Sequence, residues 1–294
     1  MKPTLFLKAT IVATTLFLLP FAGHAAKKPK PISEADAAAL AGKTAAVTLH
    51  KPSTFVAATP GKAAFALLGV AGMVKAGSDF VEDNGIEDPA VLLRTQLGAL
   101  LHEVHGLNVQ PADTTITSEK KAAKLASLHP ESDIVLSVRS IGWNYSYDVK
   151  ALHKYWLGYA AEVQLIDAKS GRQLSEMTCG ANTVSNPIKP TLAELRANRG
   201  QLAKDIFSGL GWLCVQLLAK EQFQIPADKI PAIPAEYVNP MARLQPATGT
   251  PDTAPAATAP AEATSEATTR AEPAAEPATA TVPPPADVPA SRTP

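Results

Sequence analysis

The chain has no excess of charge of either sign and no cysteine before Cys179. Lys and Arg number 27, Asp and Glu also number 27, and the formal net charge is zero. Non-specific nucleic-acid binding depends on clustered cations that neutralise phosphates, and this sequence has no long cationic block. We therefore expect no nucleic-acid partner. The lack of an early cysteine excludes the usual lipoprotein pattern, in which a cysteine directly after the leader carries the lipid.

The sequence also lacks the short motifs of common catalytic and cofactor sites. It contains no Gly-x-Ser-x-Gly nucleophile elbow, no phosphate-binding glycine loop and no dinucleotide fingerprint. His102 and His105 lie three positions apart, whereas the helical zinc-protease motif requires four. These two imidazoles suit the negative end of a helix dipole instead. We predict no catalytic residue, no cofactor and no metal site, and an enzyme stays open only because sites also assemble from distant residues.

The amino terminus has the layout of a secretory signal peptide. A basic start with Lys2 and Lys8 precedes an apolar run over residues 9–21, and small residues follow. The run is shorter than the roughly 20 residues that a membrane-spanning helix requires. We predict a signal peptide over residues 1–25, cleavage after Ala25, and a flexible leader over residues 26–43. The mature protein would then be periplasmic, and an uncleaved membrane anchor is the alternative.

The carboxyl terminus differs in composition from the rest of the chain. Residues 240–294 are rich in Pro, Ala and Thr and nearly free of large apolar side chains. Such a segment buries too little surface to offset the entropy of ordering, so we predict a disordered tail. Residues 44–239 remain between leader and tail, and their number is typical of a single domain.

Strand and helix patterns alternate within residues 44–239. Strands are predicted at residues 44–49, 107–110, 134–147, 155–165 and 174–179, and helices at 61–75, 88–105, 118–128 and 191–222. The apolar parity reverses between Val138 and Trp143, which predicts a bulge near residues 140–142. Gly171 supplies the positive φ of a hairpin turn. The predicted fold class is α+β: a two-layer mixed sheet with an antiparallel hairpin packed against helices.

The last helix has further signals of its own. Thr191 and Glu194 have the spacing of a capping box, and Gly200 predicts a break. Leu210, Leu213 and Leu217 are among the residues expected on its inward face. Cys214 lies on the same face, above the strand that carries Cys179, and exported compartments oxidise thiols. We predict a Cys179–Cys214 disulfide, with two buried unpaired thiols as the alternative.

The helix predicted at residues 61–75 is apolar on every side. A helix of this kind is either fully buried or covered by a partner or by lipid. We take five of its residues as partner-contact candidates: Phe65, Leu67, Leu68, Val70 and Met73. An internal packing helix, a contact between two copies of the chain and a peripheral membrane contact are the alternatives.

Two segments carry a resemblance to known proteins. One resemblance is to the α/β domain of the TolB amino terminus and of the curli-export lipoprotein, and it is carried by the strand Ser132–Val138 and the hairpin Val163–Arg172. The other is carried by Asn84–Pro89, which resembles a segment of uncharacterised secreted proteobacterial envelope proteins. The resemblance covers residues 44–222. It implies an envelope protein that acts by contact with other proteins and brings no catalytic residue. The missing lipid-bearing cysteine departs from the curli-export pattern, which puts an outer-membrane pore role in doubt.

These features together predict a non-enzymatic periplasmic protein that binds or helps assemble a cell-envelope protein complex. The alternative is a small-molecule carrier or hydrolase that uses the aromatic hairpin region. Trp143, Tyr145, Tyr155 and Tyr159 lie on alternating positions there. Aromatic side chains in this arrangement serve either as core and cross-strand pairs or as a ligand platform.

Overall fold

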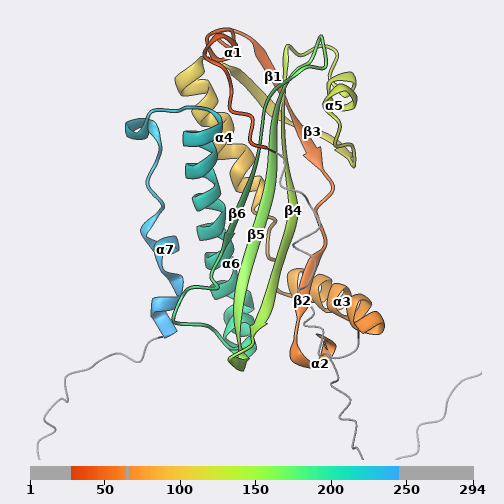
Figure 1. Ribbon diagram of the computed structural model, residues 1–294, viewed down its shortest axis with the longest axis vertical. Coiled ribbons are helices and arrows are strands. Elements are labelled where there is room, and N and C mark those ends of the chain that lie inside the picture. Colours follow the sequence, from red (N-terminus) through yellow and green to blue (C-terminus); the bar gives the residue numbers. More distant parts are fainter. Residues whose placement is uncertain (1–27, 64–65, 245–294) are drawn as a thin grey trace, which may run out of the picture. The chain divides into compact units, whose positions relative to one another are not determined.

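The computed structural model describes residues 28–63 and 66–244 (Figure 1). The predicted signal peptide and most of the predicted tail lie outside these residues. The described strands are β1 Thr44–His50, β2 Phe55–Ala58, β3 Asn108–Thr117, β4 Ile134–Asp148, β5 Ala151–Asp167 and β6 Gln173–Asn182. They form a six-stranded sheet in the order β3-β1-β4-β5-β6, and β2 pairs with β4 beyond the end of β1.

The sheet is mixed. β1 runs parallel to both β3 and β4, and β2 is also parallel to β4, whereas β4, β5 and β6 form an antiparallel meander. The turn between β5 and β6 contains Gly171 at φ +69°, as predicted for the hairpin. The fold class expected from the sequence is therefore confirmed for the described part of the chain.

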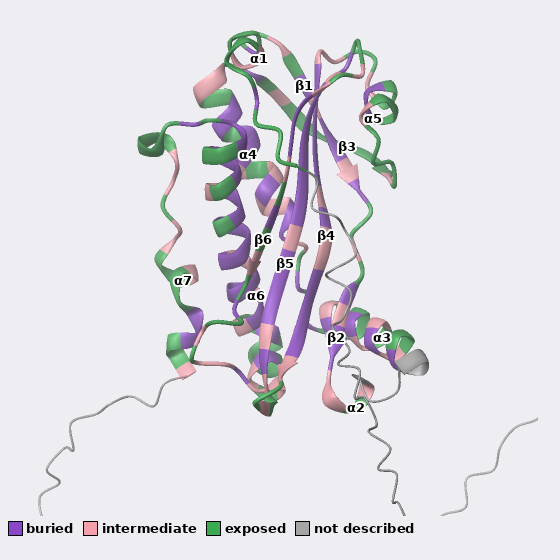
Figure 2. Cartoon of the chain, viewed as in Figure 1, coloured by how far each residue is buried: buried purple, intermediate pink, exposed green. Residues whose placement is uncertain are grey.

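Helices cover the two faces of the sheet unequally. The α-helices are α1 Glu34–Ala38, α2 Pro60–Ala63, α3 Ala66–Asn84, α4 Ala90–His105, α5 Ala122–Leu128, α6 Leu192–Leu217 and α7 Ala235–Val238. α4 and α6 lie on one face and the short α5 on the other (Figure 1). Figure 2 shows buried residues along β4, β5 and the side of α6 toward the sheet. The main apolar core therefore lies between the sheet and the two long helices.

The predicted bulge in β4 is confirmed. The pairing of β4 with β5 shifts between Ser140 and Gly142. Val138 before the shift and Trp143 after it are both buried in the core. The extra residue lets one long strand keep its apolar side chains on the helix-covered face, because a strand with a two-residue period cannot otherwise change phase.

α6 begins and breaks as the sequence predicts. The Thr191 hydroxyl accepts a hydrogen bond from the Glu194 backbone N–H at 3.2 Å, and a Glu194 carboxylate oxygen accepts from the Thr191 N–H at 2.6 Å. Residues 197–200 leave helical geometry, with Gly200 at φ +72°. The two reciprocal bonds satisfy donors that the first turn of a helix leaves unpaired.

One prediction for α6 is wrong. Leu213 and Leu217 are 47% and 39% exposed, although the sequence pattern places them inward. Leu210 and Cys214 are buried on the sheet side instead. The buried face of this helix extends to Phe207, Trp212 and Val215, whereas Leu213 and Leu217 lie on its exposed side.

Both predicted boundaries of the domain need correction. Ile32 and Leu40 belong to the core, and Lys30 exchanges two backbone hydrogen bonds with Glu176 of β6. Residues 28–43 are therefore part of the fold rather than a flexible leader. At the other end, Met241 is buried within the 3₁₀ helix Pro240–Leu244, so the fold continues past the predicted start of the tail.

Element lengths also differ from the predictions. α3 continues to Asn84 rather than ending near residue 75, and β3 extends to Thr117 rather than residue 110. α5 begins at Ala122, and Ser118 does not cap it. α4 ends as predicted, with Gly106 in the left-handed conformation at φ +65°.

Candidate functional site

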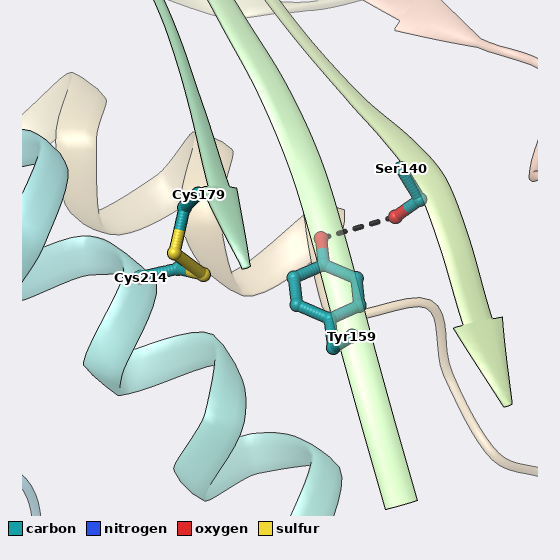
Figure 3. Close-up of a disulfide and its surroundings, with 4 residues drawn as sticks. All are labelled: Ser140, Tyr159, Cys179 and Cys214. Carbon is teal, nitrogen blue, oxygen red and sulfur yellow. Dashed lines mark hydrogen bonds between the residues drawn. A yellow bond between two sulfur atoms is a disulfide. The ribbon is translucent and has the colours of Figure 1, made fainter. Parts of the chain in front are cut away.

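Polar side chains from three elements meet at the β4 bulge. Asp88 precedes α4, and its carboxylate accepts a hydrogen bond from the Ala90 backbone N–H at 2.9 Å. The Ser140 hydroxyl donates to the same carboxylate oxygen, and it also lies 3.0 Å from the Tyr159 hydroxyl of β5 (Figure 3). The cluster ties the start of α4 to the bulge and to the neighbouring strand.

Burial controls the protonation of this cluster. Burial raises the pKa of Asp88, while the bonds from Ser140 and the Ala90 N–H oppose the rise. Burial also raises the pKa of Tyr159, and the nearby negative charge of Asp88 adds to this effect. Ser140 and Tyr159 are both buried, so a substrate has no direct access to their hydroxyls. The arrangement is that of a structural hydrogen-bond network.

A second polar pair, His50 and Ser137, joins β1 to β4. The His50 Nε2 atom lies 2.8 Å from the Ser137 hydroxyl oxygen, and both residues are buried. Burial, together with the positive charges of Arg139 and Arg94, lowers the pKa of His50 to about 4. A catalytic serine–histidine pair needs a carboxylate that stabilises the imidazolium, whereas these cations oppose it. The pair is therefore a structural contact, and burial and the two arginines disfavour the protonated imidazole.

A cavity of about 450 Å³ lies between α4 and β3. The residues that line it are Val47, Arg94, Thr95, Gly98, Ala99, His102, Val109, Gln110, Pro111 and Ala112. β3 contains extra residues relative to β1: Ala45 pairs with Val109, but Val47 already pairs with Ala112. The irregular strand therefore places Gln110 and Pro111 along the cavity, as bulges commonly do beside binding sites.

The hairpin aromatics form part of the core. Trp143, Tyr145, Tyr155 and Tyr159 are all buried. The Phe55 ring centroid lies 5.0 Å from that of Trp143 in an edge-on arrangement. Such packing stabilises a core and leaves no ring face for a ligand. The alternative function that uses the aromatic hairpin therefore lacks an accessible surface in this structure.

The predicted disulfide is confirmed. Cys179 of β6 and Cys214 of α6 are bonded, with their Cα atoms 5.5 Å apart (Figure 3). Both residues are buried. The bond closes a sequence separation of 35 residues and links the last strand to the helix that covers it. Loop closure of this length is worth about 3–4 kcal/mol on the chain-entropy account.

The partner-contact candidates divide between different surroundings. Phe65 lies outside the described residues, and for Leu67 and Leu68 only the helical backbone of α3 is described. Val70 is 54% exposed, whereas Met73 is only 6% exposed and packs inward. Met73 is therefore unavailable to a partner unless the helix moves.

α3 approaches the sheet closely at Gly77. A Cβ atom at this position would lie 2.1 Å from the Phe55 carbonyl oxygen of β2. Phe80, one turn further along, is buried against Phe55 with ring centroids 5.6 Å apart. The middle of α3 is thus anchored to β2, which fixes which side of the helix faces outward.

The remaining sequence candidates have ordinary structural surroundings. His102 Nδ1 lies 3.0 Å from the Leu107 carbonyl oxygen, and His105 Nε2 lies 3.0 Å from the Phe223 carbonyl oxygen. Within residues 28–63 and 66–244, no group of three His, Cys, Asp or Glu side chains is placed to hold a metal. One helical segment in this range, Leu192–Gln222, is long and apolar enough to cross a membrane, but 67% of its apolar window is buried within the fold.

Comparison with known proteins yields weak structural similarities. No protein-family model and no curated protein matches the chain. The chain is similar to the lipoprotein GNA1162 of Neisseria meningitidis at 15% identity, over 47% of this chain and 82% of that one, with a TM-score of 0.21. It is similar to the PelC dodecamer of Paraburkholderia phytofirmans at 16% identity, over 67% and 96%, with a TM-score of 0.26. The LpoB carboxyl-terminal domain of Escherichia coli matches at 15% identity, over 48% and 84%, with a TM-score of 0.16.

Proposed function

We propose that the chain is an exported, non-catalytic protein of the bacterial envelope that binds another envelope protein through the outer side of α3. The exposure of Val70 next to the exposed Ala71 is the observation that carries this proposal, because it leaves neighbouring apolar residues uncovered on a helix that β2 holds in place at Gly77. The disulfide supports the location, since such bonds form and persist in oxidising compartments.

The two halves of α3 differ in their outward residues. Val70 and Ala71 are exposed in the first half. The second half exposes charged side chains, and Lys75 there forms an ion pair with Asp79 at 2.9 Å. The charged side chains of the second half are well solvated by water, whereas burial of the apolar side chains of the first half against a partner lowers the free energy. The proposed contact is therefore confined to the beginning of the helix.

Site-specific photo-crosslinking in living cells tests the proposal. A photoreactive residue at position 70 should give one discrete adduct in the envelope fraction. The same probe at Val238 of α7, which is 66% exposed, provides the matched control and should give none. Osmotic-shock release of the chain tests export in the same experiment.

The substitutions Val70→Asp and Val238→Asp complete the design. Both positions are exposed, so neither change should unfold the protein. We expect only Val70→Asp to abolish the interaction. If the adduct contains only a second copy of this chain, or only phospholipid, then the proposal that α3 binds another envelope protein is wrong. Equal adduct patterns at positions 70 and 238 would refute the assignment to α3.

A further inference from the structure

The cavity between α4 and β3 has the dimensions of a small-molecule site. Its volume of about 450 Å³ falls within the range of roughly 300–1,000 Å³ that ligand pockets occupy. Arg94 and His102 mark its two ends along α4. Eight residues of helix separate them, which corresponds to about 12 Å. The space is therefore long enough for a short extended chain.

Apolar groups form the walls between these two ends. Val47 of β1, Gly98 and Ala99 of α4 and Val109 of β3 line the middle of the cavity. α4 and β3 already touch at one point, because a Cβ on Gly98 would lie 3.3 Å from a Val109 methyl group. The lining therefore combines apolar side chains from three elements with polar groups, among them Arg94 and His102 of α4.

The charge of the cavity is positive. Arg94 contributes a guanidinium group, and none of the lining residues carries a carboxylate. Asp88 is the main acidic group that attracts Arg94, but its carboxylate already accepts bonds from Ser140 and the Ala90 N–H. Within the described part of the chain, no ion pair within 4.0 Å includes Arg94. A half-buried guanidinium of this kind favours an anion with a planar pair of oxygens.

We propose that this cavity binds a small organic acid, with its carboxylate at Arg94 and its apolar chain along Val47, Ala99 and Val109. The guanidinium fork matches a carboxylate in two parallel hydrogen bonds. A strongly hydrated inorganic anion would gain less from this cavity, because the side chains of Val47, Ala99 and Val109 offer nothing in place of its water. This inference is independent of the proposed protein contact, which uses a different helix.

Titration of the purified chain, as released from cells by osmotic shock, with octanoate tests the proposal by nuclear magnetic resonance. Backbone amide signals of Thr95, Gly98 and Ala112 should shift in a saturable manner. Octanol and octylammonium have the same chain length without the negative charge, and both should bind at least about tenfold more weakly. Signal changes confined to other parts of the molecule, or none up to the solubility limit of octanoate, would overturn the proposal.

Three variants separate binding from folding. Arg94→Gln should weaken octanoate at least about tenfold without changing the affinity for octanol, because it removes a charge-assisted contact. Ala99→Trp fills the exposed mouth of the cavity and should block both probes. Lys124→Gln removes an exposed cation on α5 and should change neither. Near-ultraviolet circular dichroism checks that each variant is folded, and unchanged octanoate affinity in folded Arg94→Gln would contradict the proposal.

Discussion

Acidification should destabilise this protein through one buried imidazole, that of His50. Burial and the charges of Arg139 and Arg94 lower its pKa from 6.5 to about 4. In the window between these two values the unfolded chain binds a proton that the folded chain does not. The contribution of the neutral His50 to the free energy of unfolding is therefore fully present above pH 6.5 and is lost as the pH falls toward 4. Between pH 8 and pH 5 this one group should lower the free energy of unfolding by about 2 kcal/mol.

Urea denaturation at pH 8, 7, 6 and 5, followed by tryptophan fluorescence, measures this effect. His50→Gln removes the titrating group, so the variant should lose about 2 kcal/mol less stability than the wild type over this range. The comparison is made across pH within each protein, so any fixed cost of losing the Ser137 contact cancels. His153→Gln, at an exposed position of β5, is the control and should follow the wild type. Parallel pH profiles for wild type and His50→Gln would refute the reasoning.

Two further predictions concern packing and burial. Gly77→Ala should lower the free energy of unfolding by about 1–3 kcal/mol in urea denaturation, because its Cβ would meet the Phe55 carbonyl oxygen. A Cβ atom at Gly72 of the same helix would have no neighbour within 4 Å, so Gly72→Ala should raise the free energy of unfolding by about 0.5–1 kcal/mol. Equal effects of the two substitutions would contradict the close approach of α3 to β2 at Gly77. Asp88→Asn retains a side-chain acceptor for the start of α4, so at pH 7 it should be more stable than Asp88→Ala by about 1 kcal/mol, and the reverse order in thermal unfolding would contradict the capping role.

Local rules of sequence predicted those features that depend on neighbours along the chain. The capping box at Thr191, the break at Gly200 and the positive φ at Gly171 follow from backbone chemistry within a few residues. The bulge near Ser140 was predictable because a strand cannot change phase without an extra residue. The Cys179–Cys214 pairing was predictable because the strand and its covering helix were both recognised.

Features that depend on distant contacts were missed. The parallel pairing of β2 with β4 has no local signal. The inclusion of Ile32 in the core depends on an edge of β6 that receives the preceding chain. The exposure of Leu213 depends on where α6 sits over the sheet. A short apolar pattern specifies that a side chain can be buried, but tertiary packing decides whether it is.

The candidate site was the least predictable part of the molecule. No sequence pattern identifies Ser137 as the hydrogen-bond partner of His50, because the two residues lie far apart in the chain. The position of His50 at the end of an apolar strand is only a weak indication that its side chain has a polar partner. Arg94 has no sequence signal that separates it from any other polar residue on an amphipathic helix. The cavity beside it depends on the irregular register between β1 and β3, which pattern periodicity does not encode. Prediction of the residues that line this cavity therefore required the geometry of the sheet edge.

The most direct test of the account is the intact mass of the chain released from cells by osmotic shock, measured with and without reductant. We predict a chain that begins at Ala26 and gains the mass of two hydrogens on reduction, because export brings the chain into an oxidising compartment in which the Cys179–Cys214 bond forms and persists. A chain that retains Met1, stays with the spheroplasts and shows no mass change on reduction would contradict the proposed location and function.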